Sequence, residues 1–167
     1  KPGIAVAADV SVFYTNKNAN WGGKKGTFNY GMNISNIGSK MSYTETAARD
    51  FIPANLRLGF AYNMELDDYN ALTFTLDCNK LLVPTLPIYD QQDGNTIVSG
   101  FSNDVGVATG IIQSFYDAPG NVHFNNDGTY TIEPGSVFRE ELREINLGGG
   151  MEYNFSEVFA FRAGYFF

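Results

Sequence analysis

The sequence predicts an all-β fold, a transmembrane antiparallel β-barrel wall, from three observations. Apolar residues recur at every second position in about six segments of the length that a tilted strand needs to cross a bilayer. Tight turns or long polar links separate these segments. The chain of 167 residues is also rich in aromatic residues, at 15%, and in glycine, with 18 residues.

The first two strands are expected over residues 3–15 and 25–35. Because side chains of a strand alternate between two faces, each has one apolar and one small or polar face. A polar connection over 16–24, which contains Trp21 and Gly22-Gly23, joins them. The apolar face of the second strand consists of Phe28, Tyr30, Met32 and Ile34.

Four further strands follow the same period of two. The third and fourth are expected over 53–64 and 69–79, around a tight turn at 65–68, and a link over 36–52 precedes them. The fifth and sixth are expected over 145–155 and 158–167, around a minimal turn at Ser156-Glu157.

The long link from 80 to 144 is expected to carry structure of its own. Ser102 or Asn103 is a candidate cap for a helix over 104–116. Residues Ala108, Ile111, Ile112 and Phe115 fall on one face of that helix at helical spacing. A hairpin is expected over 122–132, with its turn at Asp127-Gly128, and a short helix over 136–144.

Charge and residue types exclude several functions. The 18 acidic against 11 basic residues give a net charge of −7, with no basic stripe, so we expect no nucleic-acid partner. Because Cys78 is the one cysteine and His123 the one histidine, we expect no disulfide within the chain and no metal site. No nucleophile–base pair or phosphate-binding loop can be assembled, which predicts no enzyme activity and no cofactor.

The link lengths predict an orientation and an incomplete barrel. Bacterial barrels have short periplasmic turns and long external loops, and the links of this chain alternate accordingly. Six strands do not close a barrel, for which eight is about the minimum. We therefore expect residues 1–167 to be one domain that is a fragment of a barrel, with strands missing at both ends and Phe167 as a truncation point. Periodicity leaves a soluble β-sandwich open as an alternative.

Four motifs resemble the PorV family (also called LptO), outer-membrane barrels of the Bacteroidetes type IX secretion system. They are GMNISNIG at 31–38, DFIPANLRLG at 50–59, DCNKLLVPT at 77–85 and GIIQSFYDAP at 110–119. The resemblance implies a barrel similar to FadL, with about fourteen strands when complete. It implies a carrier in the cell outer membrane that takes cargo, by its C-terminal signal domain, from the translocon SprA (Sov). The sortase PorU then cleaves the cargo and attaches it to lipopolysaccharide.

Two apolar segments of the long link are the candidate sites for partners or cargo. The first is the helix face with Ile111, Ile112, Phe115 and Tyr116, for which we favour a lid on the barrel mouth over a docking surface. The second lies at the external rim over 81–89 and either inserts into a neighbouring barrel or forms a stiff loop. Its candidate residues are Leu82, Val83, Pro84 and Leu86.

The small or polar face of the strands would line the barrel lumen. Its charged or polar candidates are Asp9, Arg57, Asp77, Glu152 and Arg162. We favour ion pairs that fill the interior over a solute path. The competing function is a FadL-like transporter of hydrophobic small molecules.

Overall fold

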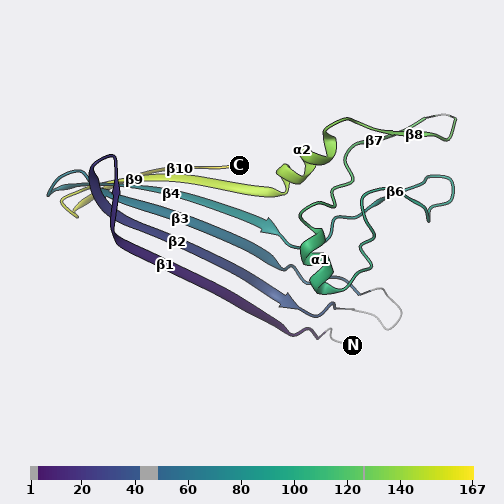
Figure 1. The fold of residues 1–167 in the computed structure, drawn as a ribbon, viewed down its shortest axis with the longest axis horizontal. Coiled ribbons are helices and arrows are strands. Elements are labelled where there is room, and N and C mark those ends of the chain that lie inside the picture. Colours follow the sequence, from purple (N-terminus) through teal and green to yellow (C-terminus); the bar gives the residue numbers. More distant parts are fainter. Residues whose placement is uncertain (1–3, 42–48, 126) are drawn as a thin grey trace. The chain divides into compact units, whose positions relative to one another are not determined.

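A computed structural model describes residues 4–41, 49–125 and 127–167, and these residues are mostly in strands. The main element is a six-stranded antiparallel sheet with the order β1-β2-β3-β4-β9-β10 (Figure 1). Its strands are β1 (Ala7–Trp21), β2 (Lys24–Gly38), β3 (Asn55–Glu65), β4 (Asn70–Leu81), β9 (Ile145–Phe155) and β10 (Phe159–Phe166). The predicted all-β fold is confirmed at this level.

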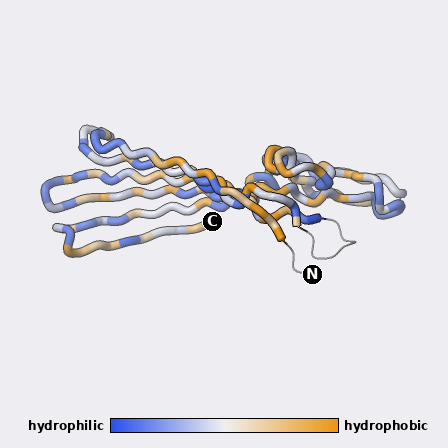
Figure 2. The backbone as a smooth tube through the Cα atoms, turned by 90° about the horizontal axis from the view of Figure 1, so that it is seen from below, coloured by the Kyte–Doolittle hydropathy of each residue, from blue (hydrophilic) through white to orange (hydrophobic). Residues whose placement is uncertain are grey.

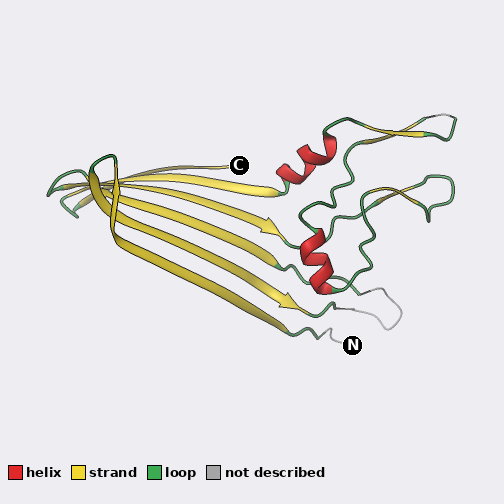
Figure 3. Ribbon diagram, viewed as in Figure 1, coloured by secondary structure: helices red, strands yellow, loops and turns green. Residues whose placement is uncertain are grey.

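The chain divides into two compact units. The first, which we call the sheet unit, contains residues 9–34, 56–80 and 146–167, and therefore most of the six strands. The second, the loop unit, contains residues 1–8, 35–55 and 81–145. Figure 3 shows that both helices lie in the segment between β4 and β9, which belongs to the loop unit.

The connection between β1 and β2 differs from the prediction. Strand β1 continues to Trp21, so the connection is two residues long and not the polar link expected over 16–24. Gly22 and Gly23 have φ values of 60° and 78°, the left-handed geometry of a two-residue hairpin turn that matches the twist of the strands. The Trp21 ring meets Tyr62 edge-on, at 5.5 Å between centroids. Because Gly22 and Gly23 form the turn, the polar residues that precede them belong to strand β1.

The other strands agree closely with the period of two. Strand β9 has the predicted bounds, and β3, β4 and β10 differ from them by at most two residues at each end. The turn at Ser156-Glu157 is confirmed, with φ values of 52° and 57°. In the β9–β10 register, Arg162 lies opposite Glu152 and Gly164 opposite Gly150. Figure 2 shows hydrophobic and hydrophilic residues alternating along the strands.

The loop unit holds two small hairpins and two short helices. The hairpin of β7 (Val122–Phe124) and β8 (Tyr130–Ile132) and the helix α2 (Ser136–Arg143) were predicted from the sequence. The hairpin of β5 (Ile88–Tyr89) and β6 (Ile97–Ser99) was not. Its turn is organised by Asp93, whose Oδ1 accepts hydrogen bonds from the backbone of Asn95 and Thr96.

The helix α1 (Val107–Gln113) is shorter than the predicted helix over 104–116. Its N-cap is Gly106, with extended backbone angles and no side-chain cap, so the expected cap at Ser102 or Asn103 is wrong. The Ser102 hydroxyl instead accepts a hydrogen bond from the backbone of Asp104, which is a local alternative to helix capping. At the other end, Ser114 is the C-cap and Phe115 and Tyr116 lie beyond the helix.

The buried hydrophobic side chains of the described residues all belong to the loop unit. They are Ala54, Leu82, Val98 and Ala118. The sheet unit instead carries exposed apolar side chains, among them Val12 at 56% and Phe161 at 69% exposure. Within the described ranges, the helices are too short or too polar to cross a membrane.

Candidate functional site

Exposed aromatic and aliphatic side chains lie on α1 and on the residues that flank it. Ile112 is 63% exposed, and Phe115 and Tyr116 are about half exposed, whereas Ile111 is half-buried. Phe101 meets Tyr116 edge-on, with ring centroids 5.5 Å apart. We call Phe101, Ile112, Phe115 and Tyr116 the α1 surface. A contiguous apolar group of this kind on a folded unit is typical of a contact site.

The side of α1 that faces its own unit is not the predicted apolar face. Ala108 is exposed, and the buried residues of the helix are Gly110 and Gln113. A Cβ on Gly110 would lie 2.7 Å from the Phe51 ring and 2.9 Å from Pro84, so only glycine permits this packing. The Gln113 amide donates to the Ser102 carbonyl at 3.0 Å and to Asp117 at 3.3 Å. The helix therefore packs on its own unit through Gly110 and Gln113, and Ala108 and Ile112 of the apolar face remain exposed.

The rim segment is divided between the interior and the surface. Leu82 is 1% exposed, its amide donates to the Ala54 carbonyl at 2.8 Å, and Pro84 is buried as well. Val83 is half-buried, and Leu86 is 70% exposed. Leu82 and Pro84 thus build the core of the loop unit, and of the four predicted partner residues Leu86 offers the most surface.

Three carboxylates meet beneath this segment. The oxygens of Asp117, Glu141 and Glu144 lie within 4.8 Å of one another. Asp117 is fully buried, and its Oδ1 has no hydrogen-bond partner, while its Oδ2 accepts from the Thr85 amide at 3.0 Å. Burial raises the pKa of Asp117, and the nearby Glu144 adds to the increase.

Hydrogen bonds give this carboxylate cluster a structural role. Glu144 accepts from the Thr85 hydroxyl at 2.8 Å, and Glu141 accepts from the Ala118 amide at 2.7 Å. Oxygen ligands of this kind suit a hard cation. Here, however, they already join α2 to two loop segments, so we assign them to the packing of the loop unit.

A groove of about 640 Å³ lies on the polar face of the sheet unit. Gly31 and Gly59 contribute to its floor, and a Cβ on Gly31 would lie 3.8 Å from the Phe13 ring. Asp77 also lines the groove, 3.1 Å from a Cβ position on Gly59. Two exposed aromatic rings, on the edge strands β1 and β10, therefore flank a band of small residues. The sequence carried the signal, because Phe13 and Phe166 occupy positions of the polar set.

The predicted lumen residues lie on the sheet as expected from their strand positions. The Arg162 guanidinium forms an ion pair with Glu152 directly across the β9–β10 ladder. The Arg57 Nε donates to Asn79 at 3.3 Å, between β3 and β4. Asp9 and Asp77 are exposed. Pairing of charges on this face is thus observed for Arg162 and Glu152.

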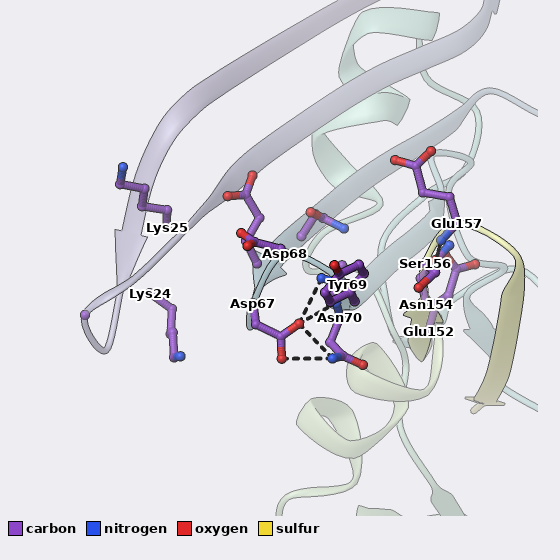
Figure 4. A pocket seen from close by; sticks show the side chains of 14 residues that line it. Lys24, Lys25, Asp67, Asp68, Tyr69, Asn70, Glu152, Asn154, Ser156 and Glu157 are labelled. Carbon is purple, nitrogen blue, oxygen red and sulfur yellow. Dashed lines mark hydrogen bonds between the residues drawn. The ribbon is translucent and has the colours of Figure 1, made fainter.

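The ends of the sheet that carry the short turns enclose a polar pocket of about 660 Å³ (Figure 4). Asp67 builds its wall: its Oδ1 accepts from the backbone of Tyr69 and Asn70, both at 2.9 Å. These hydrogen bonds, that from Tyr69 first, lower the pKa of Asp67. The Lys24 ammonium donates to the Leu66 carbonyl at 2.9 Å. Asp67 and Lys24 therefore form hydrogen bonds with backbone groups of the turn between β3 and β4.

The fold and these surfaces define a class of protein, an all-β protein whose antiparallel sheet leaves its apolar side chains uncovered. Residues 2–88 match the family model described as type IX secretion system protein PorV. The match covers just over half of the chain and includes β1 to β4, so the chain belongs to the PorV family and is a component of the type IX secretion system. No curated protein matches this chain.

Proposed function

We propose that this chain is part of an outer-membrane protein that carries secreted cargo within the type IX secretion system. In this role it binds the C-terminal signal domain of the cargo at the SprA (Sov) translocon. It then delivers the cargo to the PorU sortase complex, for attachment to lipopolysaccharide. The observation that carries the proposal is the PorV family match over residues 2–88.

The exposed apolar side chains support placement of the sheet in the outer membrane. Large apolar residues on alternate positions are exposed on strands β1, β3, β4, β9 and β10. Examples are Val10, Val12, Phe60, Phe74, Leu76, Met151, Phe159 and Phe161. In water such a face is unfavourable by about 25 cal/mol per Å² of apolar surface, and lipid removes that cost.

The two edges of the sheet support completion of the wall by further strands. Strands β1 and β10 each have a sheet neighbour on one side. In hydrocarbon, each unsatisfied backbone group costs several kcal/mol, so open edges do not persist there. We therefore propose a closed FadL-like barrel, of about fourteen strands, that includes this sheet.

The α1 surface is our proposed contact for cargo or for the translocon, together with Leu86. Aromatic side chains that are exposed on a packed support are typical energetic centres of protein interfaces. Phe115 and Tyr116 follow directly after a helix that Gly110 and Gln113 fix to its unit. Their positions are therefore set before a partner binds, which lowers the entropic cost of binding.

Purification of the full-length protein from native membranes tests this role. We expect Ile112→Ser with Phe115→Ser to reduce co-purified cargo by about 30-fold, the effect of losing an energetic centre of about 2 kcal/mol. The matched control is Tyr130→Ser with Ile132→Ser, which alters two exposed apolar residues on β8. The α1 surface would be excluded as the contact if the Ile112→Ser, Phe115→Ser variant retained its cargo. It would also be excluded if the control variant lost as much cargo.

The groove on the polar face favours a second candidate function, transport of hydrophobic small molecules. Its glycine floor and its flanking rings at Phe13 and Phe166 suit an acyl chain. We expect Gly31→Leu to fill the groove and to reduce bound fatty acid measured by mass spectrometry. If the purified protein carries fatty acid and no protein partner, this function replaces the first.

A further inference from the structure

The helix α2 directs its acidic side toward its own chain. The Glu140 carboxylate accepts from the Gly120 amide at 2.6 Å, and Glu141 accepts from Ala118. The Ser136 hydroxyl accepts from the Asn121 amide at 3.0 Å. The Gly120 backbone, with φ of 72°, fits closely because a Cβ there would lie 2.6 Å from Ser136 Oγ. The polar face that a surface helix usually presents to water is therefore used internally.

The exposed surface of α2 carries an apolar stripe and, about 100° further around the helix, a basic one. Phe138 is 68% exposed and Leu142 is 51% exposed, and their spacing of four places them on one face. Arg139 and Arg143 follow them by one residue each and are also exposed. Arg139 pairs with Glu133 at 2.7 Å, whereas Arg143 has no ion pair or hydrogen bond from its side chain within the described residues. We call these four residues the α2 face.

The basic charge of the α2 face is exceptional in its segment. Between Leu81 and Ile145, Arg139 and Arg143 are the only arginine or lysine residues, although the whole chain has a net charge of −7. Arginine in the last helical turn is favoured by the helix dipole, which accounts for Arg143 but not for exposed Phe138 and Leu142. The α1 surface has comparable apolar exposure and carries no arginine or lysine.

We infer that the α2 face docks on an anionic lipid surface, with Phe138 and Leu142 in the interfacial layer and the Arg143 guanidinium on a lipid phosphate. Apolar anchors flanked by arginine are the pattern of helices that lie in a membrane interface. Guanidinium groups bind phosphate oxygens in a bidentate manner. The inference depends on the proposed membrane placement of the sheet. Along the chain, a single residue separates the end of α2 at Arg143 from the start of β9 at Ile145.

Fluorescence quenching by labelled lipids tests the inference on the full-length protein in bilayers. An environment-sensitive fluorophore is attached at Phe138→Cys, in a background in which Cys78 is serine. The bilayers contain phosphatidylcholine, with or without phosphatidylglycerol, and a phospholipid that carries a quencher near its headgroup. A label at Phe161→Cys reports insertion of the sheet, and a label at Tyr130→Cys reports a hairpin outside the α2 face.

We expect quenching at Phe138→Cys to be stronger in phosphatidylglycerol bilayers than in neutral ones, with little quenching at Tyr130→Cys. Arg143→Gln should reduce the ratio of docked to undocked helix about fivefold in the anionic bilayers alone. The control Arg49→Gln removes another exposed arginine and should leave the ratio of docked to undocked helix unchanged. Quenching at Phe161→Cys without quenching at Phe138→Cys overturns the inference and leaves the membrane placement intact. Absence of quenching at Phe138→Cys and at Phe161→Cys overturns the docking of α2 and the membrane placement of the sheet. If Arg143→Gln leaves the quenching at Phe138→Cys unchanged, the proposed role of the arginine charge is overturned.

Discussion

The loop unit buries apolar side chains, whereas the sheet unit leaves large apolar side chains exposed. The loop unit contains all four buried hydrophobic residues of the described chain, and Leu82 is the largest of them. The sheet unit leaves apolar residues such as Phe161 and Tyr165 about two-thirds exposed. This difference indicates that the loop unit is suited to an aqueous environment, whereas the sheet unit requires an apolar one. The loop unit has a core of its own, and the sheet depends on a non-aqueous layer to cover its apolar side chains.

Buried polar groups complete the core of the loop unit. Ser99, Gln113, Ser114, Asp117 and Ser136 are all at most 9% exposed. Each of them forms a hydrogen bond, such as that from the Ser99 hydroxyl to the Pro119 carbonyl at 2.6 Å. A core of this kind is specific but small, because each buried polar group must find its partner.

Leu82→Ala should destabilise the loop unit by about 2–5 kcal/mol, because it leaves a cavity in a small core. The matched change Leu76→Ala removes the same atoms from a sheet residue that is 51% exposed, and it should have a much smaller effect. Hydrogen exchange of segment 81–145 measures the first effect, and exchange of the strand amides measures the second. Equal effects at the two sites would contradict the division into two kinds of burial.

Phe74→Arg should destabilise the sheet in bilayers by about 2–4 kcal/mol, the cost of an arginine facing lipid near the membrane centre. Thr75→Arg, one residue along β4, places the same charge on the polar face and should be tolerated. Unfolding by urea in lipid vesicles measures both. If Thr75→Arg proved the more damaging, the assignment of the two faces would be reversed.

Ser99→Ala should destabilise the loop unit by about 1–3 kcal/mol, because the Pro119 carbonyl loses its donor in a buried position. Ser102→Ala is the control, since Ser102 is exposed and its hydroxyl accepts a weak hydrogen bond at 3.3 Å. Exchange rates of residues 97–120 provide the comparison. A neutral Ser99→Ala would mean that the loop unit does not rely on its buried polar groups.

Asp117→Asn should stabilise the loop unit at neutral pH and remove part of its pH dependence. Because burial raises the pKa of Asp117 in the folded state above the ordinary 3.8, the ionised form opposes folding. Stability from this group should therefore increase as the pH falls through the raised pKa, and the gain should end near 3.8. The asparagine oxygen can still accept from the Thr85 amide.

Comparison of the variant with the native chain separates the effect of Asp117 from that of acidic groups whose pKa is lowered in the folded state. Glu133 is one of these, since hydrogen bonds from Asn121 and Arg139 lower its pKa. The difference in hydrogen exchange between the two chains should shrink as the pH approaches 3.8 from above. A difference that grew on acidification would show that Asp117 is stabilising when charged.

The long strands, the β7–β8 hairpin and α2 could be predicted from the sequence, while β5, β6 and the exact bounds of α1 could not. Alternation over about ten residues located β9 at its observed bounds, because a period of two is unambiguous over that length. It failed at β1, where Asn16, Asn18 and Asn20 resemble a loop although they continue the strand to Trp21. Strands β5 and β6 have two and three residues, which is too short for any periodic signal.

The sites depend on contacts that the sequence does not display. The inward side of α1 is set by a close approach to Phe51 at Gly110, and the spacing of apolar residues along the helix does not reveal that contact. The carboxylate cluster joins Asp117 to residues more than twenty positions away. The groove on the sheet could have been found, because Phe13 and Phe166 interrupt an otherwise small or polar set.

Accessibility of paired spin labels on β4 tests the central claim most directly. Labels at Phe74→Cys and Thr75→Cys, with Cys78 replaced by serine, report the two faces of one strand in lipid bilayers. Our account predicts that oxygen dissolved in lipid relaxes the label at position 74, and that a water-soluble nickel complex relaxes the label at position 75. If the nickel complex reached position 74 and lipid-dissolved oxygen did not, the apolar face of the sheet would not be in contact with lipid.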